Sequence, residues 1–156
     1  MAAPWICKEG GSIMSLAENK AVVRHMFDAV NASDLDRAHT LVADDITVHT
    51  SIPGIEPGRE GFRQFIGVYL SAFPEQRVEV HEMVAEGDRV LVRHTHHVTH
   101  GGEFAGMPPS GKQAIVDGLE LFRVNNGQIA EMWHHDDLLG LMQQLGAVPT
   151  PGQGGA

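Results

Sequence analysis

Hydrophobic positions in the first third of the chain follow a helical spacing. Ser15, followed three residues later by Glu18, has the pattern of a capping box. Apolar residues recur beyond it at intervals of three and four: Val22, Val23, Met26, Phe27 and Val30. The sequence therefore predicts a helix that begins near Leu16. Ser33 or Asp34 can cap a second, short helix that ends at "ADD".

A third helix is predicted after the turn-rich segment "SIPGIEPG". Its apolar stripe consists of Phe62, Phe65, Ile66, Tyr69, Leu70 and Phe73, and Pro74 ends it. The segment "ITVHT", between the second and third helices, has the alternation of a short strand. The first half of the chain is therefore expected to be mostly helical.

From Arg77 onward the hydrophobic period changes to two. Four segments alternate in this way: "RVEVHEMVA", "RVLVRHTHHVT", "AIVDGLELFRV" and "QIAEMWHHD". The turn "EGD", a Gly- and Pro-containing loop and the turn "NNG" separate them. Helices followed by an antiparallel meander predict an α+β domain in which the helices cover one face of a strongly bent sheet.

The alternation also predicts which side chains face the helices. In the second of these strands the even positions combine apolar and imidazole side chains, and we expect them to point inward: Val90, Val92, His94, His96, Val98 and His100. In the last hairpin, a three-residue "NNG" loop would pair Val124 with Gln128 and Gly118 with His134. Glu120 would then lie diagonally from His134 on the inward face. A two-residue loop would shift this register by one residue.

The opposite face of the last hairpin is also apolar. It is predicted to carry Leu119, Leu121, Ile129 and Trp133. Since both faces of the sheet must be covered, we expect one face to enclose a pocket against the helices and the other to pair with a second copy of the chain. The sequence therefore predicts a homodimer.

Composition narrows the classes of partner. A chain of 156 residues with 42% hydrophobic residues can form one sizeable core, so we expect a single domain spanning 14–147, with a disordered extension at 1–13 and a flexible tail at 148–156. The net charge of -9 and the lack of a Lys/Arg-rich run argue against nucleic acid and membrane partners. Cys7 is the only cysteine, and no secretory signal pattern precedes the first helix, so a cytoplasmic location is expected.

Four segments, in order, resemble the SnoaL-like polyketide cyclases: "GREGFRQFIGVYLSAFP", "GEFAGMPPSGK", "ELFRVNNGQIAEMW" and "DDLLGLMQQLG". The resemblance runs from about Met14 to Gly146. It implies the nuclear-transport-factor-2-like fold, a cone of bent sheet closed by three helices. It also implies enzymes of the lyase or isomerase type that close a ring of an aromatic polyketide ester by an intramolecular aldol reaction, without metal or cofactor.

The resemblance places the candidate catalytic residues at the last two strands. The family's catalytic Asp falls on His134, its catalytic His falls on Glu120, and a pocket Gln falls on Gly118. An acid and a base have therefore exchanged places. A His beside a carboxylate can still accept a proton from a carbon flanked by carbonyls, so we expect His134 to be the proton-transfer residue and Glu120 to orient it. The alternative is a buried polar pair with no catalytic role.

Other residues are predicted to bind a hydrophobic small molecule. These are His49 at the pocket mouth, His94, His96, Gly118, Phe62, Phe65, Phe122, Met107 and Met132. His94 and His96, with His134 and Glu120, could also form a metal site, but the resemblance implies none, and we expect no metal and no cofactor. His97, His100 and His135 are expected to be solvated. Asp136 and Asp137 are expected to cap the helix "LLGLMQQLG".

Two classes of function are open at this point. The first is an enzyme that moves a proton on an aromatic or polycyclic carbonyl compound, either as a cyclase or as an isomerase, hydratase or epoxide hydrolase. The second is a non-catalytic module of the same fold that binds an apolar ligand. The geometry of the pocket distinguishes them, because an enzyme requires proton-transfer groups inside the pocket and not only at its rim.

Overall fold

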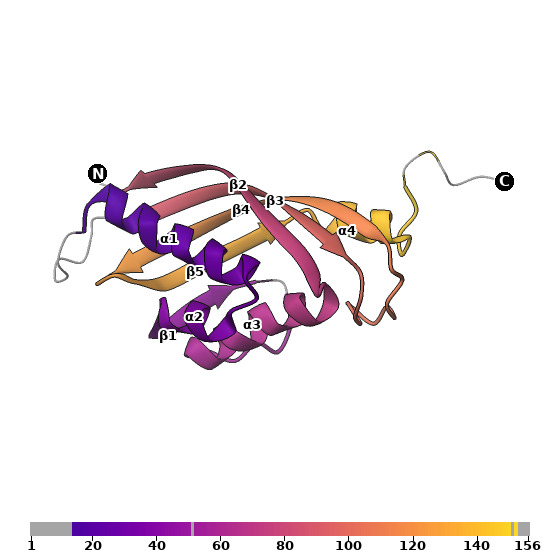
Figure 1. Cartoon of the computed structure of the whole chain (residues 1–156), viewed down its shortest axis with the longest axis horizontal. Coiled ribbons are helices and arrows are strands. Elements are labelled where there is room, and N and C mark those ends of the chain that lie inside the picture. Colours follow the sequence, from indigo (N-terminus) through magenta and orange to yellow (C-terminus); the bar gives the residue numbers. More distant parts are fainter. Residues whose placement is uncertain (1–13, 51, 151, 153–156) are drawn as a thin grey trace, which may run out of the picture.

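The computed structural model describes residues 14–50, 52–150 and 152 (Figure 1). The elements follow in the order α1 (Leu16–Asn31), α2 (Leu35–Thr40), β1 (Val42–His49), α3 (Gly58–Ala72), β2 (Glu75–Glu86), β3 (Arg89–Thr99), β4 (Gln113–Asn125), β5 (Gln128–Asp136) and α4 (Leu138–Leu145). The predicted extension, 1–13, lies outside the described residues. None of the helices in the described part of the chain is long and apolar enough to cross a membrane.

The five strands form one sheet in the order β1-β5-β4-β3-β2. Strands β2 to β5 form the predicted antiparallel meander. Strand β1 pairs in parallel with β5, so the sheet is mixed and it does not close into a barrel. The bent sheet curves over the helices, with α1 running across it and α2 and α3 beneath (Figure 1). The α+β class predicted from the sequence is confirmed.

The helix boundaries agree with the predicted caps. The Ser15 side chain accepts a hydrogen bond from the Glu18 amide at 3.2 Å, and the Glu18 carboxylate accepts one from the Ser15 amide at 2.7 Å. Of the two candidates for the second cap, it is Asp34 that accepts from the amide of Arg37, at 2.9 Å. These bonds satisfy amide groups that a helix start leaves without partners. The C-terminus of α1 is joined to β2, where Asn31 donates to and accepts from the backbone of Val78.

The final hairpin differs from its prediction in two ways. Asn125 pairs directly with Gln128, so the loop has only two residues, Asn126 and Gly127. Both have positive φ. This Asn-Gly turn matches the right-handed twist of the flanking strands. A bulge then shifts the register once more, and Ala130 is the extra residue on β5. The two shifts together place Glu120 directly opposite His134 and not diagonally from it.

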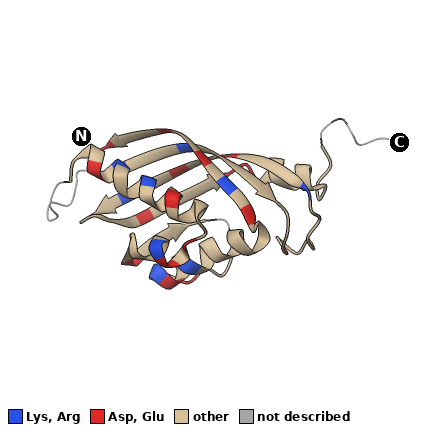
Figure 2. Cartoon of the chain, in the orientation of Figure 1, with Lys and Arg blue, Asp and Glu red and all other residues tan. Residues whose placement is uncertain are grey.

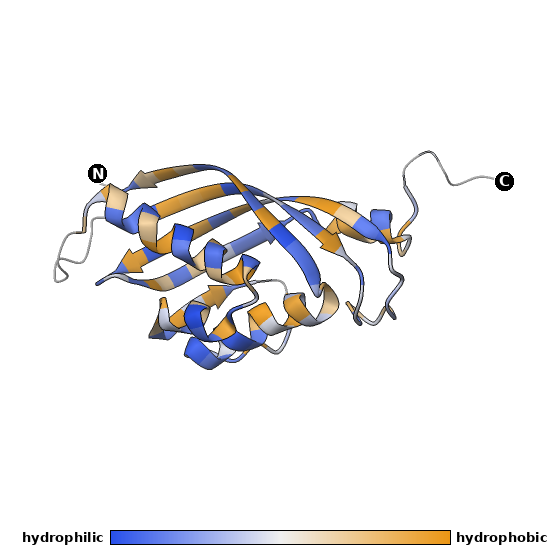
Figure 3. Ribbon diagram, in the orientation of Figure 1, coloured by the Kyte–Doolittle hydropathy of each residue, from blue (hydrophilic) through white to orange (hydrophobic). Residues whose placement is uncertain are grey.

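The bulge also changes which face carries Ile129. Ile129 pairs with Val124 and is fully buried, so the prediction that it lies on the outer face was wrong. Beyond the bulge the predicted faces are restored: Leu119 is 50% exposed on the outer face, and Trp133 is partly exposed there. Acidic and basic residues are interspersed over the helices and strands (Figure 2). The alternation of polar and apolar residues along β3 and β4 follows from the two environments of the sheet faces (Figure 3).

Candidate active site

A cavity of about 50 Å³ lies between the inner face of the sheet and helices α1 and α3. Eight predicted site residues line it: Phe62, Phe65, His94, His96, Glu120, Phe122, Met132 and His134. Tyr69 of α3 and Gln76 of β2 line it as well. The cavity is therefore an apolar chamber with a small set of polar groups on its wall, the composition that small-molecule sites usually have.

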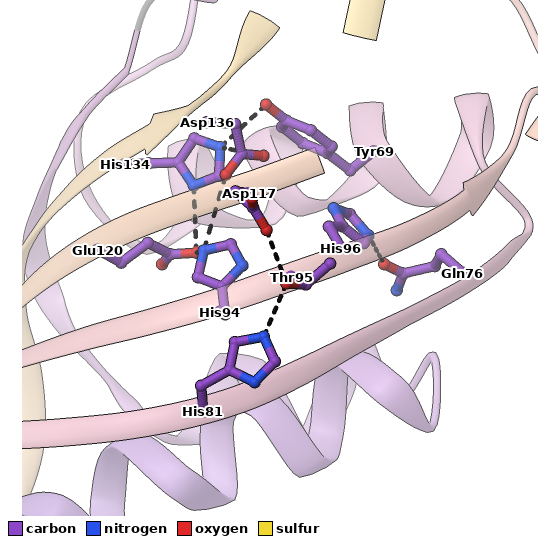
Figure 4. A network of polar contacts seen from close by, with 10 residues as sticks. All are labelled: Tyr69, Gln76, His81, His94, Thr95, His96, Asp117, Glu120, His134 and Asp136. Atoms are coloured by element: carbon purple, nitrogen blue, oxygen red, sulfur yellow. Dashed lines mark hydrogen bonds and ion pairs between the residues drawn. The ribbon is translucent and has the colours of Figure 1, made fainter. Parts of the chain in front are cut away.

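His134 lies between two buried carboxylates. Its Nδ1 is 3.2 Å from Oε1 of Glu120, the residue opposite it on β4. Its Nε2 is 3.3 Å from Oδ2 of Asp136, two residues further along β5 on the same face. The side chain of Asp136 is only 2% exposed, and that of Glu120 is 10% exposed. Two negative charges thus flank one imidazole in a region that water barely reaches (Figure 4).

This arrangement keeps His134 protonated. Burial alone would lower the pKa of His134, but Asp136 and Glu120 outweigh burial and raise it to about 12. Burial would raise the pKa of Glu120, yet its contacts with His134 and His94 lower it to about 2. At neutral pH the site therefore contains an imidazolium held by two carboxylates. The sequence predicted a neutral His134 beside one carboxylate, whereas the structure adds a second carboxylate, Asp136, which favours the protonated ring further.

Asp136 is a site residue that the sequence prediction assigned to a helix cap. Asp137 alone caps α4, where it accepts from the amide of Gly140 at 2.8 Å. Asp136 instead turns inward, as its spacing of two from His134 requires in a strand. The alternation along the strand therefore did predict that Asp136 faces inward. Two adjacent aspartates before a helix also fit a helix cap, the role that was predicted for both.

Gly118 makes room for this cluster. It pairs with Asp136, and a Cβ at Gly118 would lie 2.2 Å from Oδ1 of Asp136 and 2.5 Å from the ring of His94. We expected the space over Gly118 to hold part of a ligand. The side chains of Asp136 and His94 fill it instead. His94 is 1% exposed, with its Nε2 3.3 Å from Glu120 and 3.7 Å from Asp136, so a second imidazole lies against the same two acids.

Tyr69 connects His134 to the cavity. The Tyr69 hydroxyl lies 3.0 Å from Nε2 of His134. Because His134 is protonated, its Nε2 carries a hydrogen that has two acceptors within reach, the Tyr69 oxygen at 3.0 Å and Oδ2 of Asp136 at 3.3 Å. Tyr69 therefore accepts from His134, and the phenol proton can point to a ligand. Burial raises the pKa of Tyr69, so the phenol stays protonated. The sequence placed Tyr69 in the apolar stripe of α3, and its hydroxyl was the one polar group in that stripe.

A second polar pair, His96 and Gln76, also lies on the cavity wall near Tyr69. The His96 Nε2 makes a short hydrogen bond to the side-chain oxygen of Gln76 (Figure 4). The ring centroid of Tyr69 is 6.1 Å from that of His96 and 5.3 Å from that of His134. A separate chain of contacts, from His81 through Thr95 to Asp117, also appears in Figure 4.

Three of the predicted ligand-binding residues do not line this cavity. His49 stacks on Trp133, with ring centroids 4.7 Å apart, and pairs with Glu131 at 2.9 Å. Met107 lies in the loop between β3 and β4, and Gly118 is covered as described above. These positions contribute to packing around the site and not to the wall of the cavity.

His100 was predicted to be solvated, and that prediction was wrong. It is 1% exposed, because it continues the inward alternation of β3 and its amide bonds the carbonyl of Lys112 at 2.8 Å. Its Nδ1 is 2.9 Å from the Ser110 hydroxyl, and its ring packs 5.9 Å from that of Phe73. His100 therefore anchors the β3–β4 loop to the core.

Sequence comparison identifies relatives with similar length. The profile of the SnoaL-like polyketide cyclase family matches residues 20–145. The chain is 30% identical to aklanonic acid methyl ester cyclase DnrD of Streptomyces peucetius, over 83% of this chain and 92% of the relative. It is 27% identical to nogalonic acid methyl ester cyclase of Streptomyces nogalater, over 78% of this chain and 92% of that relative.

Solved structures share the fold of this chain. TsrD from Streptomyces laurentii superposes with a TM-score of 0.78 at 28% identity, covering 86% of this chain and 99% of the other. AclR from Streptomyces galilaeus, described as a hydroxylase, has the same TM-score at 30% identity, covering 89% of this chain and 87% of the other. Because the family profile spans most of the chain and the matches cover 92% of each relative, the protein belongs to the SnoaL-like polyketide cyclase family.

Proposed function

We propose that this protein closes a ring of a hydrophobic polyketide ester by acid–base catalysis, without a metal or an organic cofactor. The observation that carries the proposal is the contact between the buried His134 imidazolium and the Tyr69 hydroxyl, at 3.0 Å on the wall of an apolar cavity. A phenol that receives a hydrogen bond from a cation is a strong donor to a carbonyl oxygen.

The chemistry requires such a donor. Intramolecular aldol closure begins when a proton leaves the carbon beside a carbonyl, and the electron pair moves onto the carbonyl oxygen. Tyr69 would hydrogen-bond that oxygen, while the charge of His134 stabilises the negative charge that develops on it. Donors fixed in place in a low-dielectric site do this without reorganising during the reaction.

His134 therefore acts as an electrostatic partner and proton donor. Its two carboxylates, Glu120 and Asp136, are positioning residues, because each lies within 3.3 Å of a ring nitrogen of His134 and together they keep the ring charged. The exchange of acid and base relative to the family pattern thus still leaves a group that bears a proton next to the cavity. Here the proton is on an imidazole, which is positively charged when protonated, whereas a protonated carboxyl group is neutral.

The relatives suggest the class of substrate. Their names identify methyl esters of nogalonic acid and aklanonic acid, and we extend this to a related carbonyl-rich ester for this chain. A volume of about 50 Å³ is well below the roughly 150 Å³ of an apolar cavity that holds one benzene ring. Lining side chains such as Phe65 and Met132 must therefore move apart when a polycyclic ligand binds.

The test is to incubate the purified protein with each of the two methyl esters, separately, and follow ring closure by liquid chromatography with mass detection. Conversion above the rate in buffer supports the proposal. Tyr69→Phe should lower kcat by about 10²- to 10³-fold, the usual cost of losing an oxyanion donor. His134→Gln should cost about 10²- to 10⁴-fold.

His135→Gln is the matched control, since His135 is the next residue on β5 and is exposed on the outer face. It should keep full activity. If the wild-type protein binds these esters without converting them, a binding module is the better description, and if Tyr69→Phe retains full turnover, the assigned donor is wrong.

A further inference from the structure

Ring closure also needs a group that takes the proton from carbon, and His134 cannot be that group because it is already protonated. Glu120 lines the cavity, but one of its oxygens lies within 3.3 Å of both His134 and His94. Two other imidazoles line the cavity, both from β3. His94 is 1% exposed, both of its ring nitrogens are buried, and its Nε2 lies 3.3 Å from Glu120, which leaves His96 as the base that a ligand can reach. His96 is 6% exposed, and its ring centroid is 6.1 Å from that of Tyr69, the residue that also contacts His134.

The tautomer of His96 follows from its neighbour. The side-chain nitrogen of Gln76 donates to the carbonyl of Val30 at 3.1 Å, and a carbonyl can only accept. This fixes the orientation of the Gln76 amide, so its oxygen faces His96. Nε2 of His96 must then carry the hydrogen. In the neutral ring Nδ1 therefore holds the free lone pair, and it has no hydrogen-bond partner among the described residues.

His96 is neutral at physiological pH. Burial lowers its pKa to about 4, and the nearby charges of Asp136 and Glu120 offset only part of this effect, since His94 and His134 oppose them. A base of this strength is sufficient when donors stabilise the enolate: a carboxylate with a pKa of about 4.6 removes a carbon-bound proton in such a setting. The cavity wall thus carries a charged donor, His134, and a neutral acceptor, His96, with ring centroids 5.3 and 6.1 Å from that of Tyr69.

We propose that Nδ1 of His96 is the proton acceptor of the reaction, with its tautomer set by Gln76. The inference rests on the proposed function. The C–H bond beside the ester or ketone carbonyl breaks, its proton moves to Nδ1, and its electron pair forms an enolate whose oxygen accepts a hydrogen bond from Tyr69. The enolate carbon then attacks a second carbonyl carbon of the same molecule. A C–C bond forms, the carbonyl becomes an alkoxide, and the alkoxide takes the proton back from His96.

The first test needs no substrate. Nitrogen-15 NMR of histidine-labelled protein distinguishes the two neutral tautomers by the shifts of Nδ1 and Nε2. His96, assigned by comparison with His96→Gln, should be the Nε2–H form at pH 7, and Gln76→Leu should mix the two forms. An Nδ1–H signal for His96 in the wild-type protein, or a charged ring, would overturn the proposal.

The second test separates proton removal from ring closure. In deuterium oxide, aklanonic acid methyl ester should exchange its acidic carbon-bound hydrogens faster with the wild-type protein than in buffer. His96→Gln should lower this exchange and kcat by about 10²- to 10⁴-fold, with little change in ligand affinity. His97→Gln is the matched control, because His97 is the next residue on β3 and pairs with Glu79 at 3.4 Å on the outer face.

A third variant checks the role of Gln76. In Gln76→Glu a carboxylate replaces the amide oxygen, which keeps the Nε2–H tautomer and raises the pKa of His96. The acid limb of the rate profile should therefore move to higher pH, whereas a merely structural role for Gln76 predicts no such shift. If the wild-type protein closes the ring but His96→Gln folds and exchanges protons at the wild-type rate, the base is another group. If the wild-type protein does neither, the proposed function itself fails, and this inference with it.

Discussion

Gly118→Ala is the smallest change that should disrupt the acid–imidazole cluster. A Cβ at this position would lie 2.2 Å from Oδ1 of Asp136 and 2.6 Å from Nε2 of His94, whereas ordinary contacts begin at 3.4 Å. Asp136 must therefore retreat by more than 1 Å. Its other oxygen is 3.3 Å from His134, so the retreat should carry this pair beyond ion-pair distance.

The magnitude follows from overpacking a buried site. Extra methyl groups in well-packed regions cost about 1–3 kcal/mol. For a domain of this size, 1 kcal/mol corresponds to roughly 2–4 °C in Tm, so Gly118→Ala should lower Tm by about 2–12 °C. Loss of the Asp136 contact should also lower the pKa of His134 from about 12, because the hydrogen bond to Asp136 ranks first among the interactions that raise it.

Thermal unfolding followed by circular dichroism measures the first effect, and NMR titration of the His134 ring measures the second. Gly67→Ala is the control, since a Cβ there meets nothing within 4 Å and the residue lies in helix α3. That variant should be unchanged or more stable by about 0.5–1 kcal/mol. An unchanged Tm and an unchanged His134 titration in Gly118→Ala would show that the cluster is not packed as described.

Three further outcomes are expected. Because the folded state holds a proton on His134 up to a pKa of about 12, the free energy of unfolding should fall as pH rises above about 6.5. Urea unfolding at pH 7 and pH 9 measures this fall, which should be smaller in His134→Gln. We also propose that the outer sheet face, where Leu119 is 50% exposed, pairs two copies of the chain; sedimentation at micromolar concentration should show a dimer, and Leu119→Lys should yield monomer. Removing 1–13 and 148–156 should leave Tm unchanged within error, and a drop of many degrees would show that these segments dock.

The sequence was sufficient for most of the fold because its signals are local. The capping box of Ser15 and Glu18 and the stripe of α3 set the helices, and the period of two set the four strands of the meander. The parallel pairing of β1 with β5 could not be predicted, because it joins residues more than eighty positions apart through tertiary packing. The order of strands in a sheet depends on contacts between distant segments, and the residue pattern within one short segment does not reveal them.

The site was predicted in part for a related reason. Alternation placed His94, His96 and Glu120 on the inner face correctly, and these side chains do line the cavity. The charge state of His134 was not predictable, because it depends on Asp136 as well as Glu120, and Asp136 was assigned to the helix that follows. The bond from Tyr69 to His134 joins α3 to β5, so only the folded structure shows it.

The bulge at Ala130 has a consequence for how this hairpin can vary in length. Ala130 has no partner on β4, so deleting it alone would join Ile129 to Glu131 and turn the bulge into a regular ladder, with the Val124–Ile129 and Glu120–His134 pairs unchanged. Deleting a paired residue such as Trp133 would instead shift the end of the strand by one and turn His134 toward the outer face. Chains that keep an inward-facing residue at this position can therefore lose one residue at the bulge, but not between the bulge and that residue.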